Sequence, residues 1–129
     1  MLFRSKGYLQ LVGSRRLSSE LGDLVEAVNK AEKLGFVFDY NIDADGHPQN
    51  IYCRSDHYEY ARYGIPVVFM TTGGHADYHQ VTDEPQYIDY DHMADVSRLV
   101  MASAMKIANL DHRIVVDKPK PNPKGACVQ

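Results

Sequence analysis

The regular alternation of short β-type runs with helical patterns most constrains the fold of this chain. Apolar and β-branched residues fill three runs that we expect to be strands, "YLQLVG" (8–13), "FVFDY" (36–40) and "IPVVFM" (65–70). The third run is continuously apolar, which is typical of a strand buried on both faces. A helical pattern follows each run. This order predicts an α/β fold in which helices flank a mixed, largely parallel sheet.

The first helical pattern has the clearest boundaries. Ser18 or Ser19 can act as its N-cap, apolar residues then recur at helical spacing, and Gly35 ends the pattern. A shorter helix is expected from Ser55 to Tyr63. We therefore expect two helices between the three strands.

The last helix is expected to begin at Asp89 or Asp91, since either side chain can cap it. Its spacing predicts an inner stripe widened by Leu99, and the members of that stripe are Met93, Val96, Val100 and Ile107. Two histidines, His92 and His112, are expected to be exposed residues of this helix.

Size and composition exclude several classes of protein. A chain of 129 residues suggests one domain, and a net charge of -3 offers no basic field for nucleic acid. No apolar stretch approaches the roughly 20 residues of a membrane-spanning helix. The opening residues lack the apolar core of a signal peptide, and the compartment is left open.

The end of the chain differs in composition from the rest. Proline alternates with lysine in "DKPKPNPKGACVQ", so residues 118–129 are expected to form an extended, flexible tail after a domain of residues 1–117. The chain has two cysteines. Because Cys127 falls in this tail, we do not expect it to pair with Cys53.

The stretch "MTTGGHADYHQVTDEP" (70–85) gathers histidines, aspartates and a tyrosine in a glycine-led loop. Sites in open α/β sheets lie at the carboxyl ends of strands, and this loop directly follows the third expected strand. Neutral imidazole is a common zinc ligand, and a phenol beside a metal can stabilise an oxyanion. The spacing alone leaves both a solvated polar turn and the rim of a metal site open.

The surrounding sequence resembles a known family. Residues 54–93, "RSDHYEYARYGIPVVFMTTGGHADYHQVTDEPQYIDYDHM", resemble the C-terminal part of the family 28 zinc metallopeptidases, the two-zinc aminopeptidases. The matching elements are "RSDH", "GIP" before a buried strand, "GxHxDYH" and "YIDYDHM" at the start of a helix. A looser resemblance extends from about residue 8 to 117. It implies a zinc-dependent exopeptidase fold, two zinc ions in the complete enzyme, and a peptide substrate.

The resemblance also implies roles for individual residues. His79 matches the family's terminal zinc ligand, and Tyr78 before it matches the tyrosine that stabilises the oxyanion. Arg54, Asp56 and His57 match residues that shape the substrate pocket.

Two of these elements also have simpler interpretations. Ser55 and Asp56 suit the start of a helix by capping and by charge, whatever their role in binding. His75 is not a ligand by resemblance and is expected to be a surface or supporting histidine. Asp77 braces the loop or a ligand, or is a plain turn-forming aspartate, and Glu84 departs from the family's usual threonine.

The resemblance is partial. The family's zinc site needs two histidines and three carboxylates, and all but the last histidine come from sequence upstream of the matched segment. We therefore expect this chain to be the C-terminal portion of a peptidase, inactive alone. It should associate through sheet edges with its own copies or with the upstream segment. The alternative is a truncated, non-catalytic relative that acts as a structural or interaction module.

One further stretch imitates a calcium-binding loop. In "NIDADGHPQNIY" (41–52), Asn41, Asp43 and Asp45 alternate and Gly46 is sixth, but Tyr52 stands where a bidentate glutamate is required. We expect a polar, turn-rich loop there.

Overall fold

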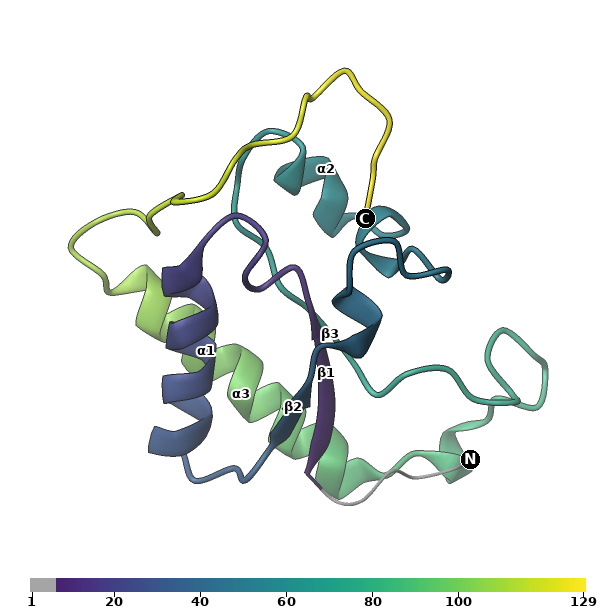
Figure 1. Cartoon of the computed structure of the whole chain (residues 1–129). Coiled ribbons are helices and arrows are strands. Elements are labelled where there is room, and N and C mark those ends of the chain that lie inside the picture. The colour runs from purple at the N-terminus through teal and green to yellow at the C-terminus, as the bar shows by residue number, and fades with distance from the viewer. Residues whose placement is uncertain (1–6) are drawn as a thin grey trace.

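The sheet has three strands with β1 at its centre (Figure 1). A computed structural model describes residues 7–129. Strand β1 (Tyr8–Val12) pairs in parallel with β2 (Val37–Asp39) and in antiparallel with β3 (Phe69–Thr71). The expected α/β class with a mixed sheet is confirmed. Since one pairing is parallel and one is antiparallel, the sheet is not largely parallel in the part of the chain described.

The third strand is shorter and less buried than its sequence predicts. Only the last part of the 65–70 run is in β3, and its residues are half-buried. The expectation of burial on both faces is wrong because β3 lies at the edge of the described sheet, where apolar residues have fewer neighbours.

Two helices cover one face of the sheet (Figure 1). Helix α1 (Ser19–Ala31) is capped by Ser18, whose hydroxyl accepts the Leu21 N–H at 3.1 Å. Helix α3 (Tyr90–Ala108) is capped by Asp89, which accepts the His92 N–H at 3.0 Å. Both caps confirm one of the two candidates that the sequence offered.

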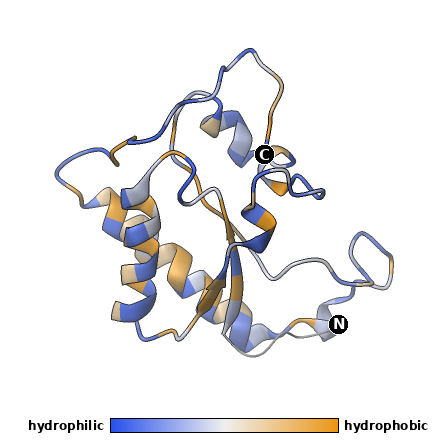
Figure 2. Cartoon of the chain, viewed as in Figure 1, coloured by the Kyte–Doolittle hydropathy of each residue, from blue (hydrophilic) through white to orange (hydrophobic). Residues whose placement is uncertain are grey.

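The main core lies between these helices and β1. Leu9 and Leu11, which alternate on one face of β1, pack with Val25 of α1 and Leu99 of α3, and all four side chains are buried. Figure 2 shows the apolar residues concentrated on the strands and on these two helices.

The inner stripe of α3 is only partly as expected. Leu99 is fully buried and Val96 packs against the core, but Met93 is 51% and Val100 48% exposed. The buried face is centred near Leu99 and Ser103, so the neighbouring Val100 turns about 100° away from it.

Short elements build a second apolar cluster beside the far end of β1. They are η1 (Asn41–Asp43), η2 (Ile51–Cys53) and α2 (His57–Ala61). A further short helix, η3 (Pro85–Tyr87), lies before α3 and is not part of this cluster. The cluster contains Val12, Leu17, Tyr52, Tyr58 and Ala61. Helix α2 begins two residues after the expected Ser55 and has no side-chain cap, so the capping role expected of that serine is wrong.

Two expectations about the remaining loops can be compared with the structure. The 41–52 stretch is a turn-rich loop, and the Asp43 carboxylate accepts the N–H of Gly13 and binds Arg16. Cys53 and Cys127 form a disulfide, with 5.7 Å between their Cα atoms, so the expectation that they do not pair is wrong. The proline- and lysine-rich composition predicted the lack of regular structure near Cys127, but it could not predict the contacts that hold this segment.

No helix among the described residues is long and apolar enough to cross a membrane. Residues 1–6, where the sequence shows no signal-peptide core, lie outside the described residues.

Candidate functional site

An open groove of about 1120 Å³ lies between the start of β1, the end of β3 and the start of α3. Its polar lining includes His75, Asp77 and Asp83 from the loop after β3, together with Asp89 and His92 from the start of α3. Because β3 runs antiparallel to β1, the groove lies at the amino ends of β1 and β2. The loop therefore follows the carboxyl end of β3, but it lies at the opposite end of the sheet from the carboxyl ends of β1 and β2.

The loop between β3 and η3 is braced by its own polar groups. Asp77 accepts a hydrogen bond from the Thr82 hydroxyl at 2.7 Å, which favours bracing of the loop among the roles expected for this aspartate. Successive turns join Tyr78 N–H to the His75 carbonyl and Gln80 N–H to the Asp77 carbonyl. Such bonds fix the loop's backbone locally, although none of its residues is fully buried.

The two residues expected to carry the chemistry lie on the solvent side of this loop. Tyr78 is 53% exposed, and its ring stacks on the His79 ring with 4.0 Å between centroids. His79 has a φ of 60°, in the left-handed region that a residue with a side chain seldom adopts. Neither residue lines the groove.

His75 faces the groove instead. Its Nε2 lies 3.8 Å from a carboxylate oxygen of Asp83, and its ring meets the ring of Tyr78 edge-on at 6.1 Å. It thus lines the groove and contacts the tyrosine, and its supporting role stays a prediction.

The candidate substrate-binding residues lie around η2 and α2. Arg54 is exposed and donates to the Gln49 carbonyl, and Asp56 is exposed. His57 is half-buried, with its ring between those of Tyr52 and Phe69. Burial lowers the pKa of His57, which favours its neutral form at pH 7.

Figure 1 shows α2 and the loop after β3 on different sides of the molecule. The structure therefore does not bring Arg54, Asp56 and His57 together with Tyr78 and His79. Within residues 7–129, the two halves of the expected site are separate.

The described residues do not fit a zinc ion. Structural and catalytic zinc sites use three or four protein ligands. No group of three or more His, Cys, Asp or Glu side chains in residues 7–129 is placed to hold a metal. His79 as a zinc ligand stays a prediction, and it would need ligands beyond those described.

Sequence reasoning missed His92 as a groove residue. Its side chain is half-buried, its ring meets Phe36 edge-on at 5.7 Å, and its Nε2 has no hydrogen-bond partner among the described residues. Counting back from Leu99 and Ser103 at helical spacing places His92 on the same inner face, so the pattern could have found it. The expectation that His92 is exposed is wrong.

His112 also differs from its expected place. It lies beyond the end of α3 rather than within the helix, and it is hydrogen-bonded to Asp111 and Glu20. These two carboxylates raise its pKa, with Asp111 contributing most.

A small mixed α/β fold with a histidine-bearing loop after β3 is compatible with a hydrolase. The family model described as Peptidase family M28 matches residues 8–104, which is most of the chain. The protein belongs to this peptidase family. No curated protein and no solved structure matches the chain.

Proposed function

We propose that this chain is the C-terminal portion of a zinc-dependent exopeptidase that removes residues from the amino ends of peptides. The observation that carries the proposal is the family match over residues 8–104, which includes the whole loop bearing Tyr78 and His79. The family supports a peptidase, and the aminopeptidase specificity is part of our proposal.

Two adjacent residues would act at the reacting carbonyl. His79 would be one ligand of the zinc that the family generally uses, and zinc would polarise the carbonyl when bound. Tyr78 would donate its phenolic O–H to the oxyanion that forms. The exposure of both rings supports these roles, because a segment bearing the other ligands could approach them without displacing core residues.

Arg54, Asp56 and His57 would border the bound peptide. Both ring nitrogens of His57 are buried and have no hydrogen-bond partner among the described residues, so His57 would reach a peptide only after a local rearrangement. Since these residues lie apart from Tyr78 and His79 here, the substrate would contact both groups only when the rest of the site is present.

The remaining ligands would come from an upstream segment or from another chain. The outer edges of β2 and β3 have no strand partner among the described residues, and open edges favour added strands. We propose that association through these edges completes the site. The 129-residue chain alone should not hydrolyse peptides.

Zinc titration of the chain by calorimetry tests the role of His79. We expect weak binding that His79→Ala weakens about tenfold or more. His75→Ala, in the same loop, is the matched control and should leave the affinity unchanged. The reverse pattern would assign any metal contact to the groove histidine and would refute our choice of ligand.

Two observations separate the enzyme from a non-catalytic module. The DNA upstream of Met1 should encode, in frame, a histidine–aspartate element and paired glutamates if the protein is an enzyme. Their absence would favour the module. Hydrolysis of a leucine arylamide by the 129-residue chain alone would overturn the view that its site is incomplete.

A further inference from the structure

The last twelve residues contact the body of the protein along their whole length. They have no helix or strand, yet contacts recur every few residues. The Lys118 ammonium donates to the Arg15 carbonyl, and Arg62 donates to the Pro123 carbonyl from its Nε at 2.9 Å. Between them the Lys120 side chain packs directly against Gly64, where a Cβ would lie only 2.6 Å from its stem. We call residues 118–129 the strap.

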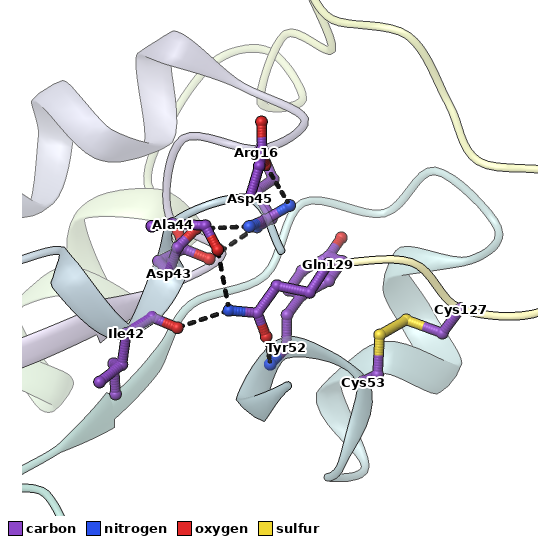
Figure 3. The surroundings of a disulfide bond; sticks show 9 residues. All are labelled: Arg16, Ile42, Asp43, Ala44, Asp45, Tyr52, Cys53, Cys127 and Gln129. Carbon is purple, nitrogen blue, oxygen red and sulfur yellow. Dashed lines mark hydrogen bonds and ion pairs between the residues drawn. A yellow bond between two sulfur atoms is a disulfide. The ribbon is translucent and has the colours of Figure 1, made fainter. Parts of the chain in front are cut away.

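The strap ends in a built socket for Gln129 (Figure 3). The residue is only 7% exposed, although it is polar and follows a segment of mostly exposed residues. Its Oε1 accepts the Tyr52 N–H at 2.8 Å, and its Nε2 donates to the Ile42 carbonyl at 2.5 Å and to the Ala44 carbonyl at 3.4 Å. The Gln129 carbonyl also accepts the Gly46 N–H at 2.7 Å.

These bonds define the chemistry of the socket. It offers one donor, the Tyr52 N–H, and two acceptors, the carbonyls of Ile42 and Ala44, to a single side chain. This set matches a carboxamide and neither a carboxylate nor an aliphatic group. A carboxylate would face two carbonyl oxygens, and an aliphatic group would leave the polar groups of the socket unpaired. Glutamine at this position therefore ties the loop of residues 42–46 to η2.

The disulfide lies two residues before this socket. Cys127 joins the strap to Cys53, the last residue of η2 (Figure 3). The residue after Cys53 is Arg54, the first candidate substrate-binding residue. His57 follows, and its ring lies 5.9 Å from the ring of Tyr52, whose N–H is held by Gln129. The strap thus holds the second and third residues of η2, Tyr52 through Gln129 and Cys53 through the disulfide.

We propose that residues 118–129 are a redox-locked strap that positions Arg54, Asp56 and His57 through the Cys53–Cys127 disulfide and the Gln129 socket, and that reduction of the disulfide releases them. The link to substrate binding rests on the proposed function. The strap itself does not, because its release is a change in local structure that needs no peptidase activity.

The releasing reaction requires a dithiol as reductant. Each protein sulfur gains one electron and one proton as the S–S bond breaks, and the dithiol loses two of each as it closes into a cyclic disulfide. The Gln129 side chain then loses the covalent tether that keeps it beside the socket. The non-covalent contacts alone must then offset the entropy cost of holding the strap against the protein.

Hydrogen exchange of the full chain, oxidised and after treatment with dithiothreitol, tests the strap. We expect the amides of residues 42–54 to exchange about tenfold or more faster after reduction. Those of β1, α1 and α3 should be unchanged. Equal exchange in residues 42–54 would overturn the proposal. Equal acceleration throughout would do so too, because the disulfide would then stabilise the whole fold rather than this segment.

Substitutions separate the socket from the disulfide. In the oxidised protein, Gln129→Ala should speed exchange at residues 42–52, and the conservative Gln129→Asn should restore part of the protection. Val128→Ala is the matched control, since that neighbouring side chain is 83% exposed, and it should change nothing. Protection that survives Gln129→Ala would exclude the socket from the mechanism.

The positioning of His57 has its own measurement. Because burial lowers the pKa of His57, release of the strap should move its titration midpoint upward toward the ordinary histidine value. NMR of the imidazole resonances reports this midpoint. Faster exchange with an unmoved midpoint would refute the positioning of His57, whatever the outcome for peptide hydrolysis.

Discussion

The ion pair between Arg16 and Asp43 offers the sharpest test of how this fold is held together. The Arg16 Nε lies 2.6 Å from a carboxylate oxygen of Asp43, and the two side chains are 18% and 10% exposed. The other carboxylate oxygen accepts the Gly13 N–H at 2.9 Å, where β1 ends. The Arg16 guanidinium also lies 4.7 Å from the centre of the Tyr52 ring. This pair therefore joins the end of β1 to η1 and η2.

Asp43→Ala should be strongly destabilising. Removing one partner of a buried ion pair costs about 3–5 kcal/mol where the other charge is left without compensation. Here the exposed Asp45 keeps an oxygen 3.3 Å from the Arg16 Nη1 and compensates part of that charge. Since both side chains keep some exposure, we expect the free energy of unfolding to fall by about 2–4 kcal/mol. Asp43→Asn should cost less, because its amide oxygen can still accept the Gly13 N–H.

A double-mutant cycle measures the pair itself. Arg16→Met keeps an unbranched side chain against Tyr52 and removes the charge, so the double variant should recover part of the loss. Urea unfolding followed by circular dichroism gives the four free energies. We expect a coupling energy of about 1–3 kcal/mol between the two sites. A coupling below about 0.5 kcal/mol would refute the argument, since it would place the pair among exposed ion pairs of little consequence.

Two further predictions concern α3 and the segment after it. Leu99→Ala should lower the free energy of unfolding by about 2–5 kcal/mol, whereas Val100→Ala should change it by about 0.5 kcal/mol or less; equal losses in urea unfolding would contradict the orientation of the helix. His112 has a raised pKa because of Asp111 and then Glu20, so its stabilisation is full below the unfolded pKa and is lost as pH rises through the folded pKa. His112→Ala should accordingly lower the thermal midpoint most at mildly acidic pH and least at alkaline pH, and a pH-independent difference would exclude this linkage.

Local sequence patterns predicted the starts of α1 and α3 well, because a capping residue acts on backbone groups only a few residues away. Ser18 and Asp89 cap their helices because a short polar side chain can reach an N–H three residues ahead. The helical spacing placed Leu99 in the core but could not centre the buried face, so Val100 was assigned inward. Successive side chains on a helix point about 100° apart, so an error of one residue moves a side chain from the buried face to the exposed face.

Long-range features had no local pattern. The antiparallel pairing of β3 with β1 joins segments far apart in the sequence, and no residue pattern within the 65–70 run encodes the direction of β3. The contact between Cys53 and Cys127 was hidden for a similar reason, since proline and lysine exclude regular structure without excluding anchorage. Gln129 belongs to no motif, and only the arrangement of Tyr52 and Ile42 reveals its socket.

The candidate site was predictable from the sequence only in the segment that resembles the family. The loop with Tyr78 and His79 was located, and the family is shown. His92 was missed because a histidine on a helix was assumed to face water. The roles of Arg54, Asp56, His57, Tyr78 and His79 stay predictions, because no ligand set is assembled within residues 7–129.

The central position of β1 has a consequence for biosynthesis. Tyr8 pairs with Val37, but Gln10 pairs with Thr71, so the middle strand leaves the ribosome long before its second neighbour exists. At translation rates of about 5–20 residues per second, the intervening chain takes roughly 3–12 s to make. During that interval one side of the nascent strand offers its backbone to any other polypeptide nearby. Yield in a host cell should therefore depend on how quickly ribosomes traverse this stretch, and slower translation should increase aggregation.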